Sequence, residues 1–112
     1  MKLPGANQAV VGREKITDYL LNPAHPDNGG KAEFFLSLGF SRDHWETLAA
    51  ALKNLAAAGD ATASTDSLHG QKYVIVGRID SPGGQTPLVQ SIWIVDKGQT
   101  AARLVTAYPR KP

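Results

Sequence analysis

Four polar side chains in the last third of this chain have the chemical types that bind a phosphate and move a proton. They are Lys72, Ser91, Thr106 and Tyr108. Three strand-like runs carry them, at residues 72–79, 87–95 and 100–108. A lysine ammonium can neutralise charge that develops on a phosphate, and hydroxyl groups can donate hydrogen bonds to its oxygen atoms. Each residue alone has an ordinary alternative as a solvated lysine, a common strand residue or a packed aromatic. The hypothesis therefore requires that the four share one sheet face.

A histidine in the first half of the chain is the best candidate for a general acid or base. His25 lies in a loop between Pro23 and Pro26, outside any apolar stripe, and imidazole titrates near neutral pH. A plain loop histidine is the alternative. Lys31 follows two glycines at an expected helix start, where it can meet an anion. The three histidines are scattered and cysteine is absent, so the sequence predicts no metal site and no cofactor.

A single domain of the α+β class, spanning residues 1–112, is expected to position these side chains. Apolar residues recur at helical spacing in a helical half, about residues 13–58. Helices are predicted over residues 13–21 and 30–38, and from the N-cap Ser41 to the stop at Gly59. Small polar residues at 59–70 predict a mobile connection to a sheet half, about residues 71–109. We therefore expect about three N-terminal helices packed on one face of a C-terminal antiparallel sheet of three to four strands.

Two turn signals give the strands a register. Centring the turns on Gly83-Gly84 and Lys97-Gly98 pairs Ser91 with Val76 on one side and with Leu104 on the other. Alternation then predicts an apolar face toward the helices, which carries Tyr73, Ile75, Ile79, Leu88, Ile92, Ile94 and Val105. The opposite, mixed face carries Lys72, Val74, Val76, Arg78, Ser91, Trp93, Leu104, Thr106 and Tyr108. On that face Trp93 fits a core anchor first and a base-stacking platform second, and Tyr108 fits packing, stacking or proton transfer.

Composition limits the class of partner and the compartment. A net charge of +2 allows an anionic partner such as RNA, without the dense basic patch of a duplex DNA binder. No apolar run approaches the roughly 20 residues of a membrane span, and the first residues lack the apolar region of a signal peptide. With cysteine absent, these features favour a protein that works in the cytoplasm, its own or that of a target cell, and not in a membrane.

Two longer motifs give the chain a family resemblance. They read Lys15-Ile16-x-x-Tyr19-Leu20-Leu21-Asn22-Pro23-x-His25-Pro26 and Gly30-Lys31-Ala32-x-x-Phe35-x-x-Leu38-Gly39-Phe40. Together with the stretches 72–76, 93–95 and 104–109, they resemble the DUF6883 family of bacterial domains. Similar stretches occur at the C-termini of polymorphic and contact-dependent toxins. The resemblance covers about residues 3–109.

The resemblance implies a fold and an activity. The toxin domains look like members of the fold shared by barnase, EndoU, the colicin ribonucleases and RelE, in which helices cover one sheet face and the other face cleaves RNA. In such enzymes the 2′-hydroxyl attacks the adjacent phosphate without a metal. The implied roles are acid or base for His25 and charge stabilisation for Lys31 and Lys72. Ser91 and Thr106 would position the phosphate, and Tyr108 would stack or assist proton transfer. A neutralising immunity protein is an implied partner.

The chain departs from the toxin-like sequences, which keeps two alternatives open. It has Gln90-Ser91 where they have Arg-Thr, and Ala107 where they have Thr. Arg78 or Arg103 can replace the missing cation if the register places one nearby, and with Trp93 they are the candidate RNA-binding residues. One alternative is a non-catalytic module of the same fold that binds RNA or a protein. The other is an interaction protein, such as an immunity partner, whose interface centres on Trp93.

Overall fold

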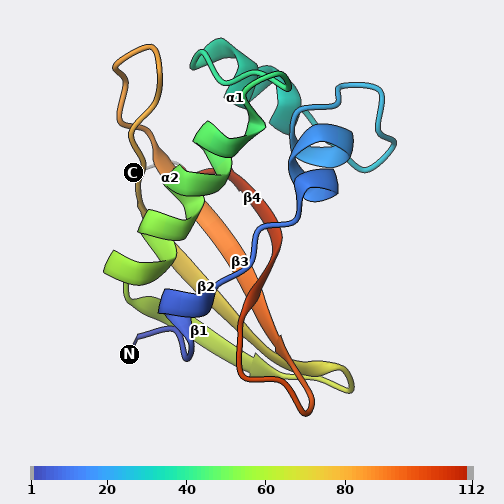
Figure 1. The fold of residues 1–112 in the computed structure, drawn as a ribbon, viewed down its shortest axis with the longest axis vertical. Coiled ribbons are helices and arrows are strands. Elements are labelled where there is room, and N and C mark those ends of the chain that lie inside the picture. Colours follow the sequence, from blue (N-terminus) through green and yellow to red (C-terminus); the bar gives the residue numbers. More distant parts are fainter. Residues whose placement is uncertain (1, 111–112) are drawn as a thin grey trace.

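The computed structural model describes residues 2–110 and confirms the α+β class, with N-terminal helices packed on an antiparallel sheet (Figure 1). The helical elements are η1 (Ala6–Gln8), η2 (Lys15–Leu20), α1 (Lys31–Ser37) and α2 (Trp45–Ala58). The strands are β1 (Ala61–Asp66), β2 (Gly70–Arg78), β3 (Leu88–Asp96) and β4 (Arg103–Pro109), in the sheet order β1-β2-β3-β4. Within the described residues, no helix is both long and apolar enough to cross a bilayer.

The helices differ from prediction mainly at their starts. The segment predicted as a helix over 13–21 forms η2, a π-helix, and the third helix begins after His44 instead of Ser41. Ser41 instead closes a turn, accepting a hydrogen bond from the His44 N–H at its carbonyl oxygen. α2 crosses the sheet in Figure 1 and buries Leu48, Leu52 and Leu55. It approaches β2 closely because Gly77 has no side chain: a Cβ there would lie 2.6 Å from Leu55 Cδ1.

A fourth strand forms in the segment that was predicted to be a mobile connection, residues 59–70. β1 pairs antiparallel with β2, and Gly70 opens β2 directly after the hairpin turn. Five of the six β1 side chains are exposed. A strand exposed in this way carries no apolar alternation, so the periodicity of the sequence could not reveal it.

The register between β2 and β3 corrects the predicted one by one residue. Ser91 pairs with Ile75 and Trp93 pairs with Tyr73, so the β2–β3 connection is centred on Gly83 and not between Gly83 and Gly84. A shift of one residue moves every side chain of a strand to the other face. Ser91 and Trp93 therefore face the helices. Leu88, Ile92 and Ile94, which were predicted to face them, lie on the opposite face, which we call the open face.

The pairing of β3 with β4 also differs from the prediction. Ser91 pairs with Ala107, not with Leu104, and a bulge leaves Val105 without a partner in β3. Because a bulge adds one residue to a strand, Leu104 and Ala107 both become buried while Thr106 and Tyr108 keep their predicted place on the open face. The outer edge of β4 is covered near its start by Val10, which forms a parallel β-bridge to Arg103.

Candidate active site

Tyr19 is the centre of a cluster of polar side chains between η2 and β4. Its hydroxyl lies 3.0 Å from Thr106 Oγ1 in a hydrogen bond. The ammonium of Lys15 lies 5.3 Å from the centroid of its ring, and that of Lys31 lies 5.2 Å from it. Lys15 is one turn before Tyr19 on η2, whereas Lys31 opens α1. Two cations from different elements therefore flank one phenol.

The surroundings of Tyr19 favour its charged form. Burial raises the pKa of the phenol, but hydrogen bonding to Lys31 and Thr106, with the positive charges of Lys31 and Lys15, outweighs burial. The net effect is a Tyr19 pKa below the ordinary value. At any pH near neutrality, Tyr19 is thus a larger source of phenolate than a free tyrosine. Such a group can accept a proton from a substrate hydroxyl.

His25 lies beside Tyr19, as an acid–base partner would. The two ring centroids are 5.0 Å apart in an edge-to-face arrangement. His25 Nδ1 accepts a hydrogen bond from the backbone N–H of Asp27 at 3.0 Å, which places the proton of the neutral ring on Nε2. An open pocket of about 570 Å³ is lined by both rings and by Glu14, Lys15, Asp18, Asp27, Val105 and Thr106. In this geometry the imidazole can donate a hydrogen bond through Nε2.

Asn28 fastens the His25 loop to η2 and α1. Its side chain is only 2% exposed, donates a hydrogen bond to the Tyr19 carbonyl at 2.6 Å, and accepts one from the Ala32 N–H at 2.8 Å. Its backbone N–H bonds to the carbonyl of His25 at 3.0 Å. One buried amide thus fixes the relative positions of Tyr19, His25 and the start of α1.

Replacement of this amide should loosen the whole cluster. We expect Asn28→Ala to lower the free energy of unfolding by about 1–3 kcal/mol, because it removes the acceptor of the buried Ala32 N–H and one of the two hydrogen bonds to the Tyr19 carbonyl. Urea denaturation followed by circular dichroism measures this. Asn7→Ala, at an exposed asparagine in η1, is the control and should change the value by less than about 0.5 kcal/mol. Equal effects of the two substitutions would contradict the role given to Asn28.

A second group of side chains continues the site along β4. Gln90 donates a hydrogen bond to the Tyr108 hydroxyl at 2.5 Å and accepts one from Arg110 Nη1 at 2.7 Å. Tyr108 lines a further pocket, of about 330 Å³, with Gly29, Gly30, Lys31 and Pro109. Lys31 therefore contacts the Tyr19 ring and also borders the Tyr108 pocket, so the two groups of side chains are neighbours.

The structure separates the sequence-predicted residues into two groups. It brings His25, Lys31 and Thr106 together. Tyr108 lies two residues after Thr106 on β4, beside Lys31. Lys72 lies on the open face but on β2, two strands away from β4, and it is exposed. Arg78 donates a hydrogen bond to the Thr86 carbonyl at 2.8 Å near the β2–β3 connection. Arg103 forms a bidentate ion pair with Asp96, at 2.7 and 3.0 Å.

Two predicted residues are buried on the opposite face of the sheet. Ser91 and Trp93 are both 0% exposed. Trp93 Nε1 donates a hydrogen bond to Ser91 Oγ at 2.9 Å, and Ser91 Oγ donates one to the Ile75 carbonyl at 2.9 Å. Trp93 belongs to the hydrophobic core, so its first interpretation, a core anchor, is the one that the structure supports.

Comparison with known proteins identifies the family. The family described as "Domain of unknown function (DUF6883)" matches residues 2–111. The chain belongs to the DUF6883 family. Among solved structures, its fold is similar to that of a chain in a contact-dependent growth inhibition toxin–immunity protein complex from Klebsiella pneumoniae 342. The TM-score is 0.74 at 16% identity, and the match covers 90% of this chain and 99% of the other. No curated protein matches the sequence.

The sequence alone did not predict Tyr19 as the central residue of the site in this DUF6883 domain. Tyr19 occurs with Ile16 and Leu20 in an apolar helical stripe, which is typical of a core position. The one available signal was Lys15 four residues earlier, because side chains at i and i+4 meet on a helix surface. Asn28 lies between two predicted helices, and nothing in its neighbours in the sequence indicates burial.

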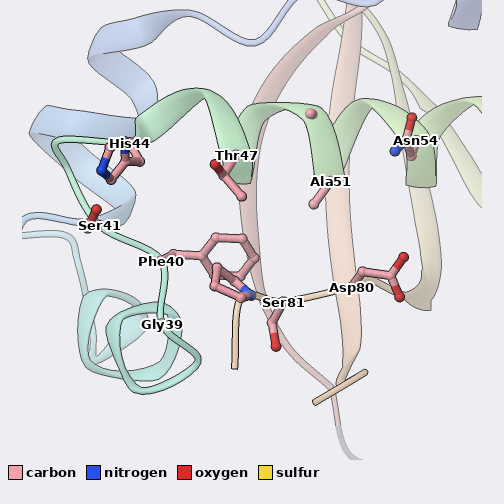
Figure 2. Close-up of a pocket in the computed structure, with 11 residues that line it drawn as sticks. Gly39, Phe40, Ser41, His44, Thr47, Ala51, Asn54, Asp80 and Ser81 are labelled. Carbon is pink, nitrogen blue, oxygen red and sulfur yellow. The ribbon is translucent and has the colours of Figure 1, made fainter. Parts of the chain in front are cut away.

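Figure 2 shows a different pocket, of about 440 Å³, between α2 and the β2–β3 connection. Phe40 lies in its middle, whereas His44 and Asp80 lie at opposite ends and do not point toward one another. Its remaining lining is Gly39, Ser41, Thr47, Ala50, Ala51, Asn54, Ser81 and Pro82. Without paired titratable groups, this pocket is a weaker candidate for chemistry than the Tyr19 cluster. Within residues 2–110, no group of three or more His, Cys, Asp or Glu side chains is arranged to hold a metal.

Proposed function

We propose that this DUF6883 domain is a toxin-type endoribonuclease that cleaves RNA without a metal ion. The observation that carries the proposal is a phenol with a lowered pKa, flanked by two lysine ammonium groups and a histidine in an open pocket. The similarity of its fold to a chain of a toxin–immunity complex supports the toxin class. A neutralising immunity protein is the partner that this class requires.

The roles follow from position and charge. The Tyr19 phenolate removes the proton from the 2′-hydroxyl, whose oxygen attacks the adjacent phosphorus. The bond from phosphorus to the 5′-oxygen breaks, and that oxygen receives a proton from the ammonium of Lys15 or Lys31. The products are a 2′,3′-cyclic phosphate and a free 5′-hydroxyl. His25 Nε2–H and the Thr106 hydroxyl donate hydrogen bonds that orient the phosphate.

This assignment modifies the roles implied by the family resemblance. Tyr19 takes the role of general base in place of His25, because His25 Nδ1 already accepts a hydrogen bond from the Asp27 N–H. Lys15 replaces Lys72 as the second cation. Ser91 is a core residue, so Thr106 is the hydroxyl that positions the phosphate. Arg110, held by Gln90, supplies a positive charge beside the position where the toxin-like sequences have arginine.

Matched lysine substitutions test the proposal. Total RNA is incubated with wild type, Lys31→Ala or Lys72→Ala in EDTA, and the 2′,3′-cyclic phosphate termini are counted. We expect cleavage by wild type, a loss of roughly 10- to 100-fold for Lys31→Ala because Lys15 remains, and a change within about twofold for Lys72→Ala. His25→Ala in the same assay should lower cleavage without abolishing it. No cleavage by wild type, or equal loss in both lysine variants, would contradict the proposal.

One observation favours a second candidate function, a non-catalytic module that binds RNA or a protein. Gln90 stands where the toxin-like sequences have arginine, and it is uncharged. Such a module would bind RNA or form a stable stoichiometric complex without producing new RNA ends. Expression in bacteria separates the two, because an active ribonuclease should arrest growth in the absence of an antidote whereas Tyr19→Phe should not.

A further inference from the structure

The pocket beside Tyr108 shares Lys31 with the Tyr19 cluster, but its other lining residues have no part in the proton transfers described above. Tyr108 lines it together with Gly29 and Gly30, which have no side chains. Both glycines have positive φ, 62° and 88°. A Cβ at Gly30 would meet no atom within 4 Å, so the absence of side chains leaves this space open.

The Tyr108 ring is held in place from its hydroxyl end. The chain of hydrogen bonds from Arg110 through Gln90 to the Tyr108 hydroxyl fixes the tip of the ring. Pairing with Gln90 across the sheet fixes its backbone. Tyr108 lines the pocket, so its ring is a surface on which a flat group can stack. A fixed aromatic face loses little conformational entropy when a second flat ring stacks on it.

The same pocket adjoins a cation that can bind a phosphate. Lys31 borders it, and the Lys31 ammonium lies 5.2 Å from the Tyr19 ring centroid. Thr106 and Tyr108 are two residues apart on one strand face, about 6.6 Å by strand geometry. A phosphate held by Lys31 near Thr106 would thus have an attached base within reach of Tyr108.

We propose that this pocket is a nucleobase subsite, in which a base next to the scissile phosphate stacks on Tyr108. The assignment rests on the proposed ribonuclease function and adds a substrate class, single-stranded RNA. Stacking on a side chain requires a base with a free face, which a base inside a duplex does not have. The enzyme should therefore cut unpaired loops and leave paired stems intact.

The binding test uses a single-stranded oligonucleotide with 2′-deoxyribose throughout, which has no nucleophile and cannot be cleaved by this chemistry. Its affinity is measured by fluorescence anisotropy. Tyr108→Leu should weaken binding roughly 5- to 150-fold, the loss of one stacked base. Tyr108→Phe keeps the ring and should bind within about threefold of wild type. Gly30→Asn tolerates the positive φ, adds a side chain at a residue that lines the pocket, and should weaken binding without changing Tyr108.

The outcomes separate this inference from the function on which it rests. Cleavage by wild type, with binding unchanged in Tyr108→Leu and Gly30→Asn, would overturn the subsite and leave the ribonuclease intact. Binding that depends on Tyr108 without any cleavage would support the subsite and remove the ribonuclease. Cleavage of a hairpin RNA in its stem as readily as in its loop would also overturn the subsite. Thermal melting confirms that each variant is folded.

Discussion

Tyr19→Phe is expected to lower the rate of RNA cleavage by about 10²–10⁴-fold, the contribution of a positioned acid or base. The substitution removes only the hydroxyl, so the ring still packs between Lys15 and Lys31. The loss should appear in kcat more than in KM, because the phenolate acts in the transition state and both cations that bind the phosphate remain. Cleavage of a defined RNA, followed in single turnover, measures the effect.

The matched control is Tyr73→Phe, which removes a hydroxyl from a tyrosine on β2 outside the Tyr19 pocket. It should change the rate less than twofold. The pH profile gives an independent check. Because the folded environment lowers the Tyr19 pKa, the wild-type rate should rise with pH and level off with a midpoint below the value of about 10 for free tyrosine. Tyr19→Phe should lose this rising limb. A variant that retains both the rate and the limb would exclude Tyr19 as the base.

Apolar spacing was enough to predict the layers of the fold. Leu48, Leu52 and Leu55 recur at helical spacing, and the third predicted helix does bury them against the sheet. Lys31 at a helix start and Thr106 and Tyr108 on one strand face were also predicted correctly. These features depend on contacts between near neighbours in the sequence, which periodicity records directly.

Which side chains of β3 face the helices could not be predicted, because that depends on whether the turn before β3 is centred on a residue or on a peptide bond. The Gly83-Gly84 pair accommodates a turn centred on the bond between the glycines or on Gly83 itself. The two choices differ by one residue and exchange the faces of Ser91 and Trp93. The bulge at Val105 then shifts the pairing within β4, so that Leu104 faces the helices whereas Thr106 lies on the open face. Neither feature leaves a periodic trace in the sequence.

The site itself depends on contacts between distant segments. Tyr19 and Thr106 are 87 residues apart in sequence and meet through one hydrogen bond. The orientation of His25 depends on Asn28, whose amide is satisfied only after η2 and α1 have packed together. A tyrosine in an apolar stripe gives the same sequence pattern whether its hydroxyl lies in the core or in a pocket. Only the packed chain distinguishes the two.

Trp93 provides the second test, because its two interpretations predict opposite results. If Trp93 is a buried anchor with no exposed surface, Trp93→Ala should lower the free energy of unfolding by about 3–5 kcal/mol. That is a large share of the stability of a single domain, typically about 5–15 kcal/mol. Guanidinium denaturation followed by circular dichroism measures it. As an RNA-stacking platform, Trp93 would instead be replaceable without loss of stability.

Two further variants separate the packing of Trp93 from its hydrogen bond. Trp93→Phe keeps most of the ring but removes the Nε1–H donor to Ser91, so its cost should be well below that of Trp93→Ala. Trp45→Ala, at a partly buried tryptophan at the start of α2, removes the same side chain from a less enclosed position and should cost less than Trp93→Ala. If Trp93→Ala unfolds at the same denaturant concentration as wild type while losing affinity for RNA, β3 must present its other face, and the phosphate site would have to be rebuilt around Ser91. If it unfolds early, the hydroxyl available to a phosphate is that of Thr106.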